Sequence, residues 1–345
     1  MTYAAMALSI NMTRQQYIAV AHATSPYVSV YPWDDSTGFG TKISNPATLP
    51  TGNGRGVGFS PSGDNICVNH ETSPFVSAYP WSSSGFGSKY TNPGTLPPGF
   101  GRTVNWSNSG ADIAQVSDTS LYITTYPWSS GFGTKYANPA TAVPNQARGV
   151  SFKPGDDAIG VAHVASPRLS IYAWTPGTGF GAKYADPATL PTDHGFSIYW
   201  TPQATDVGVA NSGAMPVTIY PWSAGFGTKY ANPTGTTPGV TGQGIKFTPR
   251  GTDIGFCTFD PPNLNYYPWV TGTGFGTRYA APATLPGTQA VCMNFSVTGL
   301  ATAVTKNSAT PYVIAYPWTS GTGFGTKYAD PATVPTGAGH GVSFI

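Results

Sequence analysis

The sequence predicts an all-β chain folded as one seven-bladed β-propeller, and three observations carry this prediction. A motif close to YPWSSGFGTKYANPATLP recurs seven times along the 345 residues. Each repeat divides into four short apolar runs bounded by turn residues, which is typical of a four-stranded antiparallel blade. The two ends of the chain are incomplete repeats that together make one blade.

The spacing of the motif sets the size of the repeat. Its tryptophans follow one another at intervals of 48, 47, 46, 48, 47 and 49 residues. Propeller blades are usually repeats of about 40–50 residues, whereas most solenoid repeats are shorter. We expect these tryptophans to pack between blades, and stacking on sugars in seven like sites is the open alternative. They are Trp33, Trp81, Trp128, Trp174, Trp222, Trp269 and Trp318.

Four strands are predicted in each repeat, named a to d in chain order. In the first complete repeat they fall at 56–60, 65–70, 75–81 and 86–90. No segment has a sustained 3.6-residue period, so no helix is predicted. The predicted blades are 16–44 together with 341–345, then 56–90, 103–136, 149–184, 196–230, 244–279 and 291–328.

The chain ends indicate a closed ring. The chain enters at a strand b, residues 17–20, and leaves at a strand a, residues 341–345. Pairing of these two strands would remove two exposed sheet edges that otherwise invite aggregation. Residues 1–15 lie outside the repeat and are predicted to be an N-terminal arm, with a flexible tail as the alternative.

Composition excludes several classes of protein. The formal net charge is only +2 and no basic run occurs, so no nucleic-acid partner is expected. Cys67, Cys257 and Cys292 are odd in number and lack CxxC spacing, which favours buried thiols over disulfides or zinc. No apolar stretch reaches the roughly 20 residues of a membrane span. The opening segment has no basic n-region, so no secretory signal is predicted.

One position varies within the otherwise regular repeat, four residues before the strand a aromatic. Strand a is innermost in a propeller, so this position should lie near one mouth of the central channel. Arginine occupies it on three consecutive blades, where it could bind an acidic peptide, a carboxylated sugar or a phosphate. Solvated arginines at loop ends are the alternative. The seven residues are Arg55, Arg102, Arg148, Phe196, Gln243, Val291 and His340, and the predicted binding residues among them are Arg55, Arg102, Arg148, Gln243 and His340.

A second ring of seven basic residues falls in the predicted strand d, the outer edge of each blade. Lysine at a sheet edge prevents edge-to-edge pairing, and a belt that docks on an acidic partner is the alternative. These residues are Lys42, Lys89, Lys135, Lys183, Lys229, Arg278 and Lys327.

The remaining titratable residues suggest no catalytic or metal site. His22, His70 and His163 end strand b on separate blades, so we expect turn residues and not converging ligands. Asp34 and Asp35 are adjacent and should point apart. Glu71 is the only glutamate, and the aspartates near the a–b turns are expected to form those turns. They are Asp64, Asp112, Asp157, Asp206 and Asp253. No nucleophile, zinc or nucleotide motif is present, so no cofactor and no enzymatic activity are predicted.

The order of strand a, SPSGD, strand b and a strand c ending in tryptophan resembles the WD-repeat pattern, although aspartate follows the tryptophan only at Asp34. The segments AVAHATSPYVSVYPW and NPATLPTGNGRGVGFSPSGD also resemble propeller repeats of tailed-bacteriophage structural proteins. This resemblance covers residues 16–345. It implies a virion decoration, tail or fibre protein, although fold alone does not imply function.

The function expected from these observations is a non-enzymatic phage structural or adhesion scaffold. Its partners would be other virion proteins or a glycan or protein of the host surface, and its location the virion. A multivalent carbohydrate-binding propeller is the alternative. A lactonase or glycosidase propeller is a third class, which needs a central cluster of acids or metal ligands that the sequence does not offer.

Overall fold

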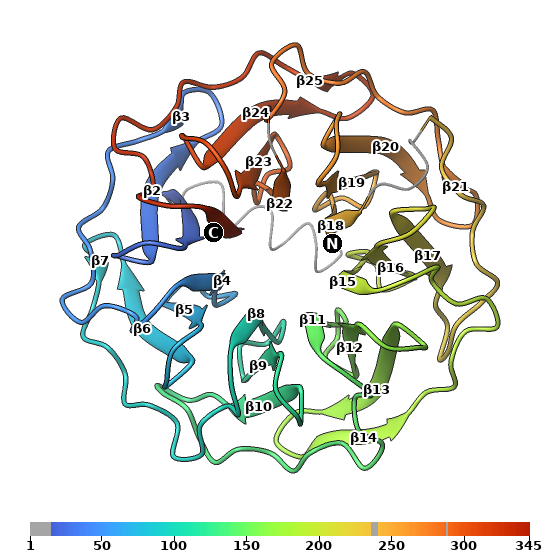
Figure 1. Ribbon diagram of the computed structural model, residues 1–345, viewed down its shortest axis with the longest axis horizontal. Helices are drawn as coiled ribbons and strands as arrows, with labels where there is room; N and C mark the ends of the chain where they lie inside the picture. The colour runs from blue at the N-terminus through green and yellow to red at the C-terminus, as the bar shows by residue number, and fades with distance from the viewer. Residues whose placement is uncertain (1–14, 236–240, 288) are drawn as a thin grey trace, which may run out of the picture.

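The computed structural model describes residues 15–235, 241–287 and 289–345. They form seven antiparallel sheets arranged like spokes around one axis, and the described residues contain no helix (Figure 1). The seven-bladed propeller is therefore confirmed. The predicted arm, residues 1–15, falls outside the described residues except for Gln15.

The blades repeat one strand order from the axis to the rim. The innermost strands are β4 (Gly54–Phe59), β8 (Gly101–Trp106), β11 (Ala147–Phe152), β15 (Gly195–Trp200), β18 (Gly242–Phe247), β22 (Ala290–Phe295) and β26 (Gly339–Phe344). The second strands are β1 (Gln16–His22), β5 (Asn65–His70), β9 (Asp112–Ser117), β12 (Ala158–His163), β16 (Asp206–Asn211), β19 (Asp253–Thr258) and β23 (Ala301–Lys306).

The third strands carry the tryptophan motif, and the fourth lie at the rim. The third strands are β2 (Val28–Asp34), β6 (Val76–Ser82), β10 (Ile123–Pro127), β13 (Leu169–Thr175), β17 (Val217–Pro221), β20 (Leu264–Val270) and β24 (Val313–Thr319). The outer strands are β3 (Gly38–Phe39), β7 (Gly85–Phe86), β14 (Gly179–Lys183), β21 (Gly274–Phe275) and β25 (Gly323–Phe324). In the other two blades the outer strand is reduced to one bridge, Trp128 to Phe132 and Trp222 to Phe226.

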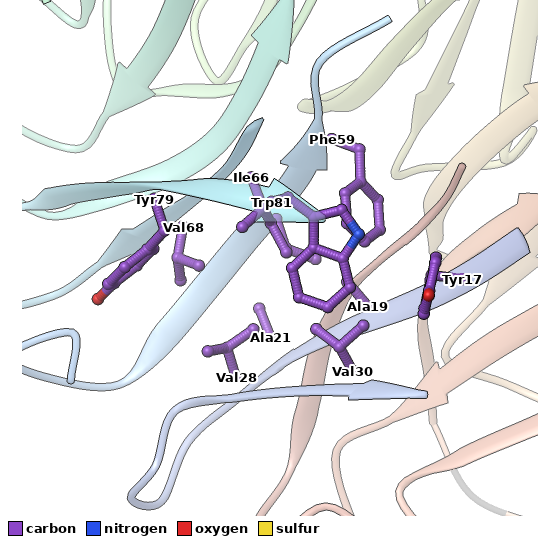
Figure 2. Close-up of a cluster of buried hydrophobic side chains, with 11 residues drawn as sticks. Tyr17, Ala19, Ala21, Val28, Val30, Phe59, Ile66, Val68, Tyr79 and Trp81 are labelled. Atoms are coloured by element: carbon purple, nitrogen blue, oxygen red, sulfur yellow. The ribbon is translucent and has the colours of Figure 1, made fainter. Parts of the chain in front are cut away.

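The core lies between blades. Trp81 makes edge-to-face contacts with Phe86 of its own blade and with Tyr17 of the preceding blade, at centroid distances of 5.0 and 5.1 Å. Figure 2 shows Trp81 beside Ala19 and Val30 of that preceding blade. Such aromatic pairs stabilise by about 0.5–1.5 kcal/mol beyond their buried area. The seven motif tryptophans are only 1–8% exposed, so they pack as predicted and cannot offer stacking faces to sugars.

The ring is closed, as predicted from the incomplete repeats at the two ends of the chain. β26 pairs with β1 in an antiparallel ladder from Ile18 opposite Phe344 to His22 opposite Gly339. The backbone of Tyr17 and that of Ile345 exchange two further hydrogen bonds, 2.8 and 3.0 Å long. The first blade is therefore built from both ends of the chain, as Figure 1 shows at the end marked C.

Two predicted strand boundaries are wrong. Strand a begins two residues earlier than predicted, at Gly54 and Gly339, because the strand resumes pairing beyond a bulge. Strand d spans only Gly85 and Phe86 in β7, because the next residues keep only separate hydrogen bonds to the third strand, from Gly87 N to the Pro80 carbonyl and from Tyr90 N to the Ala78 carbonyl, and no regular ladder. Among the seven outer basic residues, only Lys183 lies within a strand.

Candidate functional site

Seven side chains are set apart from the strand ladders at one end of the axis. Each innermost strand has a register shift at its second residue, which is left unpaired with the second strand; in β8 the shift also includes Thr103. A β-bulge of this kind turns a side chain out of its normal alternation and is frequent beside functional sites. We call these residues the axial ring: Arg55, Arg102, Arg148, Phe196, Gln243, Val291 and His340. They are the residues that the sequence placed at the channel mouth.

Arg55 and His340 form the first part of this ring. Arg55 Nη1 lies 3.0 Å from His340 Nε2, and His340 Nδ1 lies 2.9 Å from the Gly54 carbonyl oxygen. A carbonyl and a guanidinium fix the tautomer, because Nδ1 must donate to the former and Nε2 must accept from the latter. Burial, followed by the positive charge of Arg55, lowers the pKa of His340 to about 4. The imidazole is therefore neutral at pH 7.

Two carboxylates hold the first two arginines. Glu71 Oε1 accepts from Arg55 Nε at 2.5 Å, and Glu71 Oε2 accepts from Asn53 Nδ2 at 2.9 Å. Asp118 Oδ1 accepts from Arg102 Nε at 2.9 Å, and its other oxygen pairs with Arg102 Nη2. Each acid lies 16 residues after its arginine, directly after the second strand of the blade. These pairs fix both guanidinium groups.

Arg148 has no acid of its own. In its blade the residue directly after the second strand is Val164, where the two preceding blades have an acid. The nearest carboxylate oxygen is Asp118 Oδ1, which lies 3.9 Å from Arg148 Nε, beyond hydrogen-bonding distance. Within the described residues this buried Nε has no hydrogen-bond partner. Burial and the neighbouring Arg102 lower the pKa of Arg148. The guanidinium carbon lies 5.7 Å from the centroid of the Phe196 ring.

The cluster therefore carries an uncompensated positive charge. Three guanidinium groups face two carboxylates and one neutral imidazole, which leaves a net charge of +1. Arg148 shares Asp118 with Arg102 and donates from Nη2 to Gln146 Oε1 at 3.2 Å, but its Nε has no acceptor within the described residues. A partly buried cation with an unused donor favours a bound anion, because a charge-assisted hydrogen bond is about twice as strong as a neutral one. The other arc of the ring is uncharged and holds Phe196, Gln243 and Val291.

Sequence reasoning missed Glu71 and Asp118 as members of this cluster. The sequence does contain a signal for this pairing. Among the seven blades, an acid stands directly after the second strand in only two, and in both of them the axial-ring residue is arginine. In each of these blades the arginine and its acid lie side by side, because the first and second strands form one hairpin. The register places Gly54 opposite His70 in one blade and Gly101 opposite Ser117 in the next.

The three strand-end histidines have structural contacts. His70 Nε2 lies 3.0 Å from Ser77 Oγ, and His70 Nδ1 lies 2.8 Å from the Thr72 carbonyl oxygen. His163 has the same pair of contacts, and His22 the same serine contact. Burial lowers the pKa of all three to about 4. They are buried, hydrogen-bonded residues at the ends of the second strands and not turn residues, and they lie on separate blades. Within the described residues no group of three His, Cys, Asp or Glu could hold a metal ion.

Three of the aspartates expected to form the a–b turns are instead buried at the start of a second strand. Asp112, Asp206 and Asp253 are fully buried, and each accepts a hydrogen bond from a tyrosine hydroxyl at 2.6–2.7 Å. The tyrosine follows the outer strand of the same blade and packs on the tryptophan of the next. These carboxylates therefore link neighbouring blades.

The outer basic residues are held by the loops that follow them. Lys135 Nζ donates to Asn138 Oδ1 at 2.6 Å and to the Tyr136 carbonyl oxygen at 3.1 Å. Lys183 and Lys327 pair with Asp186 and Asp330. The same side-chain contact to the residue three positions on recurs at Lys42, Lys89 and Lys229, while Arg278 donates to backbone carbonyls. Their main contacts fasten the loops to the rim.

Asp34 and Asp35 do not form a carboxylate pair. Asp34 accepts hydrogen bonds from the backbone of Ser36 and Thr37 and so caps its own turn. Asp35 accepts from the Trp33 indole at 2.7 Å. Both are structural residues.

Comparison with known proteins finds similarity in the fold of the chain and not in its sequence. No family model and no curated protein matches the sequence. Solved structures match over nearly the whole chain. A candidate 6-phosphogluconolactonase from Bacteroides fragilis has 12% identity and a TM-score of 0.77, with 97% of this chain and 99% of that chain covered. One from Bacteroides uniformis has 12% identity and a TM-score of 0.75, with 96% and 99% covered. The periplasmic gluconolactonase of Pseudomonas aeruginosa has 14% identity and a TM-score of 0.71, with 96% and 99% covered.

These matches correct the function expected from the sequence. The prediction of a non-enzymatic phage structural protein, with its carbohydrate-binding alternative, is wrong, since the three similar structures named above are called lactonases and none of them a phage protein. At 12–14% identity the likeness establishes the fold alone. The predicted partners and the virion location stay predictions. The described residues contain no helix long and apolar enough to cross a membrane.

Proposed function

We propose that the axial ring binds a phosphorylated sugar lactone and hydrolyses it. The observation that carries this proposal is Arg148, a partly buried guanidinium whose Nε has no hydrogen-bond partner in the described chain and which has no acid in its own blade. Arginine presents a planar fork of donors that matches a phosphate. The uncharged arc beside it, with Phe196 next to Arg148, suits the carbon skeleton of a sugar.

Lactone hydrolysis needs one proton acceptor and one donor for the carbonyl oxygen. His340 Nδ1 carries the hydrogen, and the lone pair of Nε2 becomes available once the Arg55 N–H that it accepts in the free protein turns to the substrate. Water then attacks the carbonyl carbon and gives a proton to Nε2, while the same N–H of Arg55 donates to the developing oxyanion. The bond from the carbonyl carbon to the ring oxygen breaks, and that oxygen takes the proton from His340. The acid formed ionises and releases one proton.

The first test is hydrolysis of 6-phosphogluconolactone, with gluconolactone as the uncharged comparison, followed by the proton released. We expect Arg148→Ala to raise KM for the phosphorylated lactone by about 10- to 100-fold, because charged hydrogen bonds contribute about 1.5–3 kcal/mol. KM for gluconolactone should change little. Arg250→Ala is the matched control, since Arg250 lies exposed in the turn at the far end of β18. A wild-type protein that hydrolyses neither lactone faster than buffer would overturn the proposal.

His340 provides an independent pH test. We expect kcat/KM to fall as the pH drops through about 4, because the imidazolium cannot accept a proton. The fall in kcat should lie at higher pH, because a bound phosphate offsets the arginine charge that helps to lower the pKa of His340. His340→Gln should lower kcat by about 10²- to 10⁴-fold and remove this limb. The phosphate of the substrate ionises near pH 6, and this ionisation changes the rates of the wild-type protein and of His340→Gln alike. A pH profile that His340→Gln leaves unchanged would exclude this residue as the proton acceptor.

A further inference from the structure

Neighbouring innermost strands approach each other closely beside the axial ring. The residue that follows the ring residue has no side chain in four of the seven strands, where it is Gly56, Gly149, Gly244 or Gly341. A Cβ atom at Gly149 would lie 2.7 Å from the Cα atom of Ser197 in the next blade, closer than real Cβ atoms come to their neighbours. At these glycines the bulge of one strand therefore packs directly on the backbone of the next.

Thr103 occupies this position in the third blade and replaces the backbone contact with a hydrogen bond. Its hydroxyl donates to the carbonyl oxygen of Arg148, the ring residue of the next blade, at 2.7 Å. Pairing with the second strand is also interrupted for longer in β8 than in the other innermost strands, because the interruption includes both Arg102 and Thr103. Thr103 therefore connects its own bulge to the bulge that carries Arg148.

Asn69 holds Thr103 from the other side. It lies in β5 of the second blade, is fully buried, and donates from Nδ2 to the Thr103 carbonyl oxygen at 3.0 Å. The orientation of this amide is fixed, because a carbonyl oxygen can only accept. Two hydrogen bonds thus connect the second, third and fourth blades, which are the three blades that carry the arginines of the axial ring.

We propose that Asn69 and Thr103 are positioning residues for the anion site of the axial ring. They set the separation of Arg102 and Arg148, so that both guanidinium groups reach one phosphate. The two arginines share Asp118 and repel each other, so ion pairing alone does not fix this separation. Donors that are already in place bind an anion more tightly than donors that must first be ordered. This inference rests on the phosphate binding that the proposed function includes.

The test is the affinity of the full chain for inorganic phosphate, measured with ¹⁵N-labelled arginine at the Nε–H resonance of Arg148, which Arg148→Lys assigns. Thr103→Val keeps the shape of the side chain and removes the hydroxyl. We expect it to raise the Kd for phosphate by about 3- to 10-fold, the effect of one hydrogen bond. Thr103→Ser keeps the hydroxyl and should restore the wild-type Kd to within about twofold.

The kinetic constants should divide in the same way. Thr103→Val should raise KM for 6-phosphogluconolactone by a similar factor and leave kcat unchanged, because His340 and Arg55 stay in place. A loss of stability alone would not produce this division, nor its reversal by serine.

The chain supplies matched variants for Asn69. Asn69→Ala recreates the residue that three other blades have at this position, Ala21, Ala162 and Ala210, so the protein should fold and its Kd for phosphate should rise as in Thr103→Val. Thr305→Val is the control. Thr305 is buried at the same position of the seventh blade, and its hydroxyl contacts the Cys292 carbonyl oxygen of its own blade, so the Kd should not change. Urea unfolding verifies that each variant is folded.

A Kd for phosphate that is the same in Thr103→Val and in the wild-type protein would overturn the proposal. Weak binding by Thr103→Ser would do so too, as would a wild-type Arg148 resonance that phosphate does not move. Hydrolysis is decided separately. A protein that shows the expected changes in phosphate affinity but hydrolyses neither lactone would refute the proposed reaction and leave the role of Asn69 and Thr103 standing.

Discussion

A chain that ends at residue 338 is expected not to fold into the native ring. The deletion removes β26, whose Val342 and Phe344 are buried and whose ladder completes the first blade. Burial of two such side chains contributes about 3–6 kcal/mol, and each ladder hydrogen bond adds about 1 kcal/mol. The loss is comparable to the entire stability of an ordinary protein, about 5–15 kcal/mol. Near-ultraviolet circular dichroism and urea unfolding measure the result.

A synthetic peptide of residues 339–345 is the matched control for this deletion. If the missing strand alone causes the defect, the peptide should restore cooperative unfolding when it is added to the shortened chain. Phe344→Ala should fold with about 3–5 kcal/mol less stability, since it removes only the ring that packs on Trp33. An unchanged urea midpoint in the shortened chain would mean that β26 does not hold the ring closed.

Acid is expected to unfold the protein through its buried histidines. The pKa of His22, His70 and His163 is about 4 in the folded chain and about 6.5 when exposed. The unfolded chain therefore binds more protons between these values, so the free energy of unfolding falls as the pH drops from about 6.5 to 4. The loss is at most about 3 kcal/mol for each histidine. Urea unfolding from pH 7.5 to 4.5 measures the slope.

The chain itself offers the matched variant for this prediction. Asn211 occupies the equivalent strand end in another blade and accepts from Thr218 Oγ1 at 3.0 Å, where His70 contacts Ser77. His70→Asn with Ser77→Thr should therefore fold and should reduce the pH slope by about one proton. A stability that stays constant between pH 7 and 4.5 would contradict the prediction, as would an unchanged slope in this variant.

Periodic packing made the architecture predictable. The spacing of the tryptophans and the incomplete terminal repeats were enough to place seven blades and the closure of the ring. The position of Arg55, Arg102 and Arg148 followed from the same repeat. The bulge at these positions could not be predicted from the repeat, because it depends on the pairing of two strands and has no local signal such as a glycine with positive φ.

Three-dimensional pairing explains the errors at the site. Glu71 and Asp118 lie next to arginines that are 16 residues away in sequence, and only the hairpin brings them together. Asp112 has the spacing of a turn residue, but the next blade covers it and makes it an acceptor for Trp174. The predicted function is wrong for a different reason: the resemblance of the repeats to those of phage proteins reflects a shared fold, and one fold serves many activities.

The bulge at the second residue of each innermost strand separates the chemistry around the axis from the stability of the fold. The seven side chains at these positions lie outside the hydrophobic clusters between blades, so exchanging one of them is expected to change the charge around the axis more than the stability of the chain. The present set of three arginines, one histidine, one glutamine and two apolar residues is one of many that the same backbone can carry.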